Sequence, residues 1–261
     1  MTAQTLVSVV FADGLAHLRL ANPAQGNVLD LPMIAALDAA VGQVESADVR
    51  AILISAEGRN FCVGGDLRGM AAAEDRGALL RQMADGLHAS LRRIAALGVP
   101  VVIAVNGSAA GAGLSLAAFG DIVIGGQDSS YMMAYTAIGL SADGGATFAL
   151  PRLIGLRLTQ EMAFLNRRLN AVEALAAGLI TQVVADDALL DESMAVARRL
   201  AQGPTGAFRR IKQLLADGYL SDLGTQLDSE AEAIASAAAM ADAGEGVRAF
   251  LERRKPDFRG E

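Results

Sequence analysis

The sequence is poor in aromatic residues: they make up 4% of its 261 residues, and tryptophan is absent. The interior must therefore be built mainly from smaller apolar side chains, and a hydrophobic content of 52% supplies enough of them. A chain this apolar buries enough surface to offset its conformational entropy, which excludes a disordered protein. The length fits one large domain, or one domain with a smaller appendage.

Cysteine and histidine are also scarce. Cys62 is the only cysteine, so no intramolecular disulfide is possible, and this favours a reducing compartment. Two histidines and one cysteine are too few for a His/Cys metal site, so we expect no metal. The N-terminal stretch lacks a secretory-signal pattern, and no apolar run reaches the roughly 18 residues of a membrane span. We therefore expect a soluble, cytoplasmic protein that does not bind a membrane.

Positive charge is in short supply as well. The chain carries 22 basic and 29 acidic residues, a formal net charge of −7. Binding of nucleic acid needs a broad basic face, so a nucleic-acid partner is not expected. A local cluster of cations would still permit binding of a small anionic ligand.

The predicted strands indicate an α/β fold with a parallel sheet. Residues 5–11 and 15–20 flank an Asp13-Gly14 turn, which is typical of a hairpin. Short and almost wholly apolar runs are expected of strands covered on both faces, as in a parallel sheet. Such runs are found at residues 49–54, 101–105 and 122–124.

Helices are predicted between these strands and after them. Asp30 is placed to cap a helix before the first buried strand, and the apolar positions from Leu80 to Ile94 predict a second helix, which ends at Gly98. Asn170 and Glu173 have capping-box spacing, so a further helix is expected to begin there. From this point to the C-terminus helices dominate the pattern.

Two glycine-rich loops follow buried strands: FCVGGD at residues 61–66 and NGSAAGAG at residues 106–113. Glycines at such positions let backbone N–H groups turn toward a ligand, and a helix that follows adds the positive end of its dipole. Two converging N–H groups would form an oxyanion hole, which stabilises the enolate of a thioester. Either loop taken alone is more simply a tight turn between a strand and a helix.

Other motifs that contain glycine or serine do not fit. The run from Gly111 begins like a dinucleotide fingerprint, but Leu116 stands where the third glycine belongs. The Gly-Lys-Ser/Thr of a P-loop does not occur in the sequence. The segment around Ser115 falls short of a nucleophile elbow, and both histidines precede this serine, unlike the order in α/β-hydrolases. A dinucleotide-binding enzyme and a serine hydrolase are therefore disfavoured.

Five segments together resemble the enoyl-CoA hydratase/isomerase (crotonase) family. They are GRNFCVGGDL, PVVIAVNGSAAGAGLSLAAFGDIVI, GLSADGGATFALPRLIG, RRLNAVEALAAGLITQVV and GVRAFLERRKPDF. They follow one another over nearly the whole chain. The resemblance implies an α/β fold, a repeated ββα spiral that binds acyl-CoA at residues 1–200, and a helical trimerisation region at residues 201–261. Residues 187–254, which read as helices with one break at Gly203-Pro204, agree with this division.

The resemblance also implies an acyl-CoA thioester as substrate, no cofactor beyond that CoA, and a homotrimer or hexamer. The backbone N–H groups of Gly65 and Ala112 would form the oxyanion hole. Relatives often have glycine at the Ala112 position. Alanine keeps the backbone N–H donor but narrows the space above the oxyanion hole. Val63 and Gly65 would line the path of CoA. Arg68 and Arg253 would lie near its phosphates, Arg253 from a neighbouring subunit, although each is as readily a solvated cation.

Hydratases of this family resemble one another in two glutamates that hold a water molecule. Ser115 and Tyr135 stand at those positions here, and Asp143 stands where hydratases commonly have glycine. Isomerases for dienoyl-CoA and for the ring epoxide of phenylacetyl-CoA resemble this chain in having the aspartate, and the ring-epoxide type is closest in motif. Moving a double bond needs one carboxylate that removes a proton and returns it elsewhere. Asp143 is thus the predicted acid/base, with Tyr135 and Ser115 as candidate auxiliaries.

The sequence favours an acyl-CoA isomerase that shifts a double bond or opens a ring epoxide. A hydratase in which Asp143 holds water with Tyr135 or Ser115 stays open, and so does a CoA-thioester-binding member without turnover. Thioester hydrolysis or dehalogenation through attack by Asp143 is less favoured. Asp143 is also plausible as a plain turn residue before two glycines. Methionine is often core filler, but candidates to line an apolar acyl pocket are Met70, Met83, Met132, Met133 and Phe148.

Overall fold

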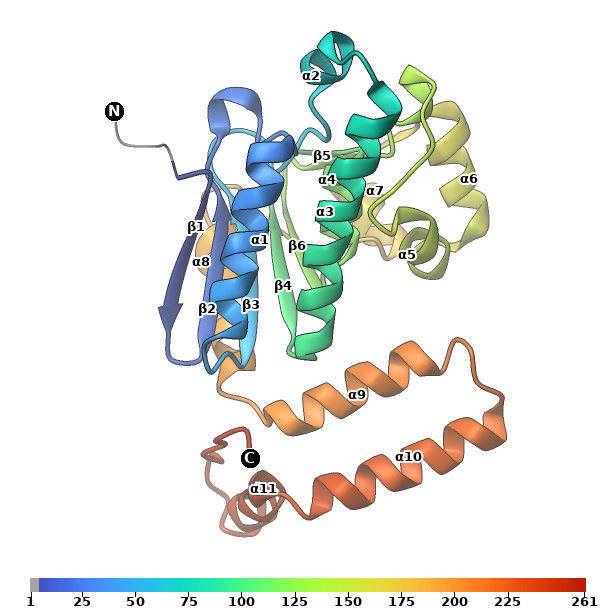
Figure 1. Cartoon of the computed structure of the whole chain (residues 1–261). Helices are drawn as coiled ribbons and strands as arrows, with labels where there is room; N and C mark the ends of the chain where they lie inside the picture. Colours follow the sequence, from blue (N-terminus) through green and yellow to red (C-terminus); the bar gives the residue numbers. More distant parts are fainter. Residues whose placement is uncertain (1–4) are drawn as a thin grey trace.

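A six-stranded sheet forms the centre of the fold in the computed structural model, which describes residues 5–261 (Figure 1). Residues 1–4, the start of the stretch searched for a secretory signal, lie outside the described part. In spatial order the strands are β1 (Val7–Ala12), β2 (Leu15–Leu20), β3 (Ala51–Ala56), β4 (Val101–Val105), β6 (Ile122–Gly126) and β9 (Gln182–Val184). The first two form the predicted antiparallel hairpin, and all later neighbours pair in parallel, as predicted.

A second, three-stranded sheet explains the spiral. It consists of β5 (Ser108–Ala110), β7 (Ser130–Met132) and β8 (Arg168–Asn170). Each of the central strands β4 and β6 is followed by one strand of the second sheet and then by a helix, which makes a ββα unit. The chain therefore steps between two sheets as it advances, as the resemblance implied.

Helices cover the large sheet on both faces. On one face α1 (Leu31–Glu45) packs against α3 (Arg76–Leu97), and on the other α8 (Leu189–Ala201) packs on β3 and β4. The strand side chains alternate accordingly, because Ile52 and Ile54 join the first core and Leu53 the second. This two-sided burial is why the sequence of β3 reads as a continuous apolar run.

The predicted helix starts are confirmed. The Asp30 carboxylate accepts the Met33 N–H at 2.8 Å and caps α1. Asn170 and Glu173 form the reciprocal capping box of α7 (Ala171–Ala177). The shorter helices are α2 (Leu67–Ala72), α4 (Ala112–Ala118), α5 (Ala146–Leu153) and α6 (Gly155–Leu165). None of the helices formed by residues 5–261 combines the length and apolarity needed to cross a bilayer.

The C-terminal region is a separate helical layer below the sheets in Figure 1, formed by α9 (Thr205–Asp217), α10 (Leu223–Ala238) and α11 (Ala241–Leu251). The prediction of a single break was wrong. Besides the break at Gly203-Pro204, the chain turns again at Gly218, and it turns once more at Met240. Asp222, which caps α10 by accepting the Thr225 N–H, marks the second of these breaks.

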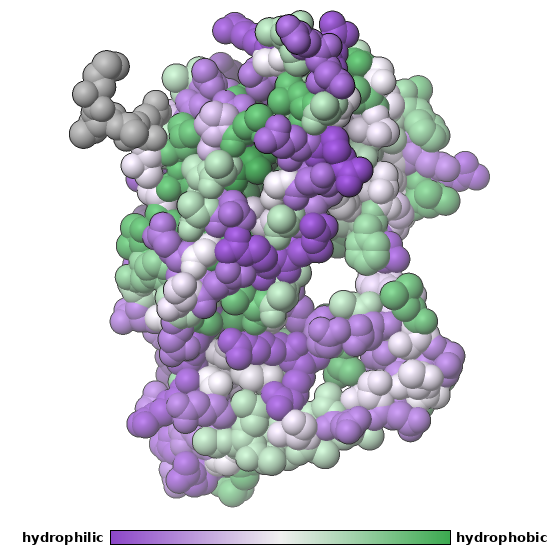
Figure 2. Space-filling model, in the orientation of Figure 1, coloured by the Kyte–Doolittle hydropathy of each residue, from purple (hydrophilic) through white to green (hydrophobic). Residues whose placement is uncertain are grey.

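Polar contacts attach this layer to the α/β body. Arg50 donates to the carbonyl groups of Gly203 and Phe258, and Lys212 pairs with Asp121. No residue within α10 is buried, and Figure 2 shows apolar side chains in green among the polar ones on the surface of the layer. The most exposed apolar side chains there are Leu215, Leu220, Leu223, Ile234, Phe250 and Leu251.

Candidate active site

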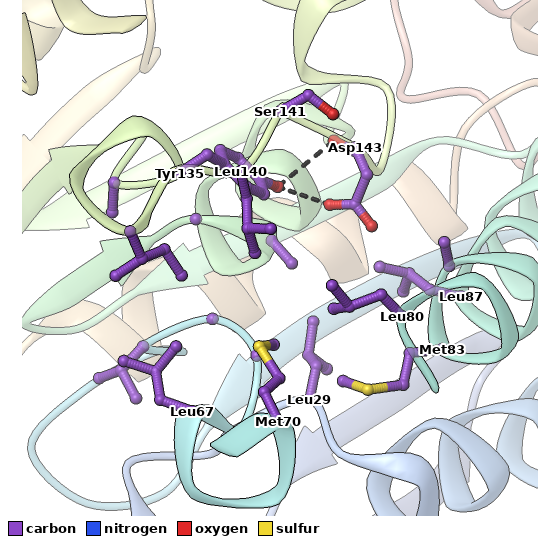
Figure 3. Close-up of a pocket in the computed structure, with 18 of the residues that line it drawn as sticks. Leu29, Leu67, Met70, Leu80, Met83, Leu87, Tyr135, Leu140, Ser141 and Asp143 are labelled. Atoms are coloured by element: carbon purple, nitrogen blue, oxygen red, sulfur yellow. Dashed lines mark hydrogen bonds between the residues drawn. The ribbon is translucent and has the colours of Figure 1, made fainter. Parts of the chain in front are cut away.

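A cavity of about 470 Å³ lies between the two glycine-rich loops, α2, α3 and the segment before α5 (Figure 3). Its lining is mainly apolar. The polar side chains among the described lining residues are Arg81, Tyr135, Ser141 and Asp143. The larger apolar ones are Leu29, Ile34, Leu67, Met70, Leu80, Met83, Leu87, Ile138 and Leu140.

The predicted apolar lining is right in part. Met70 and Met83 line the cavity. Met133 is instead buried in the core, 3% exposed, and Met132 is the last residue of β7. Phe148 faces a neighbouring cavity of about 390 Å³.

The two glycine-rich loops are joined by backbone hydrogen bonds. The Cys62 N–H donates to the Ser108 carbonyl at 3.1 Å, and the Ala110 N–H donates to the Cys62 carbonyl at 3.0 Å. Gly113 lies directly against that same Cys62 carbonyl, so that any side chain at this position would overlap it. Burial raises the pKa of the Cys62 thiol to about 12. Cys62 is thus a buried packing residue. The hydrogen bonds between the two loops bring Gly65 and Ala112 to the same cavity.

The backbone N–H groups of these two residues are available to a ligand. Ala112 is the first residue of α4, so its N–H has no acceptor within the helix. Gly65 forms a parallel bridge with Leu29, in which the Leu29 N–H bonds to Gly64 and not to Gly65. The alternation of a parallel ladder turns the Gly65 N–H to the opposite side. Two donors at one cavity are the arrangement that an oxyanion hole requires.

Asp143 lies in the same cavity and is held by Tyr135 and Ser115, the two residues at the positions where the resemblance led us to expect glutamates in a hydratase. The Tyr135 hydroxyl donates to Asp143 Oδ1 at 2.7 Å, drawn as a dashed line in Figure 3. The Ser115 hydroxyl donates to the Asp143 carbonyl at 2.8 Å and lies 3.0 Å from the Tyr135 hydroxyl. Among the described lining residues Asp143 is the only carboxylate. The sequence thus identified three residues that the fold brings into contact.

Tyr135 is a neutral donor in this cluster. Burial, and then the negative charge of Asp143, raise the pKa of the Tyr135 hydroxyl well above its ordinary value. The phenol therefore keeps its proton and directs it at the carboxylate. The Asp143 side chain is 32% exposed, so it is open to the cavity while Ser115 beneath it is buried.

The sequence did not indicate one residue of this cluster. His88 Nε2 accepts the Gly144 N–H at 2.9 Å and lies 3.9 Å from Asp143 Oδ2. No local motif marks this histidine, because its partners are more than fifty residues away in the chain. His88 follows the buried Leu87 on α3, but this position alone gives no indication of its partners.

Only two of the four residues predicted to contact CoA line the cavity of their own chain. Val63 and Gly65 line the cavity, whereas Arg68 lies outside the lining, in the first turn of α2. Arg253 follows α11, and this helix lies at the opposite end of the molecule from α2 (Figure 1). Arg254 beside it is paired with Glu245 and Glu252. A role for Arg253 therefore requires another subunit, as the resemblance implied.

Comparison with known proteins shows to which family the chain belongs. The sequence model of the enoyl-CoA hydratase/isomerase family matches residues 11–261. The chain belongs to this family. The 1,2-epoxyphenylacetyl-CoA isomerase of Escherichia coli (strain K12) is 39% identical over 253 residues, which cover 95% of either protein. A Rhodobacter capsulatus protein named "Probable enoyl-CoA hydratase" is also 39% identical, over 95% of this chain and 96% of its own.

Solved structures of the family confirm the fold. A crystal structure from Mycobacterium abscessus, described as an enoyl-CoA hydratase/isomerase, matches with a TM-score of 0.94 and 38% identity. The match covers 98% of this chain and 100% of that one. The crotonase-type α/β fold with a helical C-terminal region is therefore right. The names of family members include both an isomerase and a hydratase at equal identity.

Proposed function

We propose that the chain is an isomerase of CoA thioesters that uses Asp143 as its acid/base. The observation that carries the proposal is the make-up of the polar cluster. One carboxylate, that of Asp143, faces the cavity. The residues at the two positions where the resemblance expects hydratase glutamates are neutral: the Tyr135 hydroxyl donates to this carboxylate and the Ser115 hydroxyl to the backbone carbonyl of Asp143. The 39% identity to a 1,2-epoxyphenylacetyl-CoA isomerase supports the same reaction class.

The proposed reaction moves a proton and leaves the composition of the substrate unchanged. The thioester carbonyl accepts hydrogen bonds from the N–H groups of Gly65 and Ala112, so negative charge that develops on its oxygen is stabilised. Asp143 removes a proton from one carbon, and the electron pair passes into the enolate. The protonated Asp143 then returns the proton to another carbon of the conjugated system. With a ring epoxide next to the enolate, the electron pair instead breaks the adjacent C–O bond, and the protonated Asp143 gives its proton to the oxygen that is released, so the composition is again unchanged.

The apolar lining indicates the acyl group that this site accepts. Apart from Arg81 near the rim, the polar side chains are those grouped around Asp143. A buried hydroxyl or carboxylate on the acyl group would find few partners along the rest of the wall, which disfavours its binding. We therefore propose an aliphatic or cyclic acyl group that carries no hydroxyl or carboxylate.

The CoA moiety is proposed to bind through cations near the mouth of the cavity. Arg68 and the Arg253 of a neighbouring subunit are the candidates, and both are exposed. Screening weakens interactions between exposed charges, so we expect the dissociation constant for an acyl-CoA to rise with added salt. The double variant Arg68→Gln/Arg253→Gln should lose most of this salt dependence. Unchanged binding in titration calorimetry after both substitutions would exclude this placement.

Mass spectrometry on a panel of acyl-CoA substrates tests the reaction class. Isomerisation gives a product of unchanged mass with a new retention time, whereas hydration adds one water. Release of free CoA thiol would indicate hydrolysis, and binding without turnover of any substrate would indicate a member that has lost catalysis. The hydratase is the second candidate, because the Rhodobacter capsulatus relative carries that name at equal identity. A gain of water by crotonyl-CoA, with no isomerised product, would overturn our proposal.

A further inference from the structure

The peptide unit that joins Asp143 to Gly144 is held at both of its polar groups by side chains. The Ser115 hydroxyl, from α4, donates to the Asp143 carbonyl at 2.8 Å. His88 Nε2, from α3, accepts the Gly144 N–H at 2.9 Å. The Asp143 carbonyl also accepts the Ala146 N–H at 3.2 Å, in the turn that leads into α5. Two side chains from two helices thus add to a backbone turn at one peptide unit, which is a specific arrangement.

The packing around this peptide unit is equally close. Gly144 has a φ of +62°, and a Cβ atom there would lie 2.7 Å from the Ser115 Cβ. Ser115 itself is 2% exposed, so its hydroxyl has no access to water as an alternative partner. The peptide unit therefore has little freedom to rotate, and its orientation sets the direction in which the Asp143 side chain leaves the backbone.

We propose that His88 and Ser115 form a peptide clamp that aims the Asp143 carboxylate, so that both are positioning residues. This inference rests on the proposed function of Asp143. Tyr135 occupies Oδ1, and no residue within the described part donates a hydrogen bond to Oδ2. Oδ2 is thus the oxygen left to exchange a proton with substrate, and its aim depends on the clamp. Misplacement of a reacting group by about 1 Å can cost ~10²-fold in rate.

The clamp requires one protonation state of His88. A ring nitrogen that accepts an N–H carries no proton, so the neutral ring has its hydrogen on Nδ1. Protonation of Nε2 would remove the acceptor for Gly144 and place a cation 3.9 Å from Asp143 Oδ2. Both effects would turn the Asp143 carboxylate away from the substrate. We therefore expect activity to fall when the pH is low enough to protonate His88.

The charged groups around His88 are few. Asp85 and Arg92 lie on its own helix, and Asp85 is paired with Arg81. The residues of α4 carry no charge, and Asp143 is the charged group on the loop that packs against the ring. Arg152 is the charged residue of α5, and its guanidinium lies over the ring of Phe148. Asp143 is thus the partner whose position a His88 cation would change.

Steady-state kinetics over a pH range test the clamp. His88→Leu removes the acceptor, and we expect kcat to fall about 10- to 100-fold with little change in KM. His88→Gln offers an amide oxygen that can accept the Gly144 N–H but does not titrate. It should recover part of the rate, and its activity should persist to lower pH than that of the wild type. His17→Gln, at the chain's only other histidine, is the control and should keep the wild-type pH profile.

Equal kcat in His88→Leu and wild type would overturn the clamp, and so would an acid limb that is identical in wild type and His88→Gln. Because the two residues act on one peptide unit, Ser115→Ala should lower kcat about tenfold, and the double variant with His88→Leu should be less than multiplicative. Independent, fully multiplicative losses would contradict a shared clamp.

A measurement without turnover separates the clamp from the proposed function. The ¹⁵N chemical shifts of the two labelled histidines in the full-length protein report which ring nitrogen carries the hydrogen. We expect an unprotonated Nε2 at His88 in the wild type and also in Asp143→Asn, whose backbone is unchanged. A proton on Nε2 at neutral pH would overturn the clamp even if Asp143 is catalytic. An unprotonated Nε2 together with full activity of Asp143→Asn would instead overturn the proposed function.

Discussion

At the scale of single residues, the informative feature is what replaced the expected glutamates. Ser115 and Tyr135 do not supply a second carboxylate, and both use their hydroxyl groups to hold Asp143. A second negative charge at this distance would compete with Asp143 for protons. Neutral donors leave one carboxylate to act alone, which suits the transfer of a proton from one carbon to another.

Tyr135→Phe isolates the contribution of one of these donors. The ring is kept, but Asp143 Oδ1 loses its 2.7 Å hydrogen bond. We expect kcat to fall about tenfold, because a hydrogen bond to a charged group contributes roughly 1.5–3 kcal/mol and part of it is regained from water. The pKa of Tyr135 is raised by burial and by Asp143, so the wild type should show no loss of activity from phenolate formation below about pH 10. An alkaline limb that disappears in Tyr135→Phe would contradict a neutral phenol.

At the scale of elements, the site depends on the close approach of two loops. Gly113 in the first turn of α4 touches the Cys62 carbonyl of the other loop, and no side chain fits between them. The distance between the Gly65 and Ala112 N–H groups is therefore set by a glycine that itself faces no ligand. Overlap of this kind is relieved only by movement of backbone, since neither atom belongs to a flexible side chain.

Gly113→Ala tests this dependence. We expect a loss of about 1–3 kcal/mol in the free energy of unfolding, measured with urea, and a fall in kcat, because the two N–H groups are moved apart. Gly244→Ala is the matched control. It lies in α11 with open space around it, so it should be neutral or gain up to about 1 kcal/mol from helix propensity. Wild-type kcat in Gly113→Ala would show that the loop spacing is not critical.

The elements also show how far the sequence alone could go. The starts of α1 and α7 were predictable because each cap acts within one turn of the chain. The strands β5, β7, β8 and β9 were not identified as strands, since each has only three residues and shows no alternation. The break before α10 carried a readable signal at Asp222, a helix cap that was overlooked.

The candidate site likewise contains residues that could be predicted from the sequence and one that could not. Asp143, Ser115 and Tyr135 were recognised because the family resemblance gave meaning to departures from it, and the fold then brought them together. His88 could not be predicted, because its hydrogen bond to Gly144 depends on how α3 packs against a loop 56 residues later. Residues that act through tertiary contact with a backbone group leave no pattern in the local sequence.

At the scale of the whole molecule, the helical layer of residues 201–261 leaves large apolar side chains exposed in a single chain. Leu220 is 86% exposed, Leu223 is 74% exposed and Ile234 is 72% exposed, which is too much apolar surface for an isolated layer. Arg253 is also remote from the cavity of its own chain. Both observations support the prediction of a trimer or a dimer of trimers.

Light scattering at micromolar concentration checks this prediction. We expect the mass of three or six chains, and we expect Leu227→Glu/Ile234→Glu on α10 to give smaller species, because buried charge at an apolar interface is costly. Asp228→Asn, on the same helix, is the control and should keep the wild-type mass. A wild-type protein that stays monomeric would refute the trimer, and it would also remove Arg253 as a CoA contact.

The most direct test of the central claim is solvent deuterium exchange into an accepted acyl-CoA substrate, compared between wild type and Asp143→Asn. The amide keeps the size of the side chain but cannot take up a proton. We expect the variant to fold and to bind acyl-CoA like the wild type, and its exchange and turnover to fall by at least about 10⁴-fold, the upper range for general acid/base groups. Wild-type exchange and turnover in Asp143→Asn would show that another group moves the proton and that Asp143 is not the acid/base.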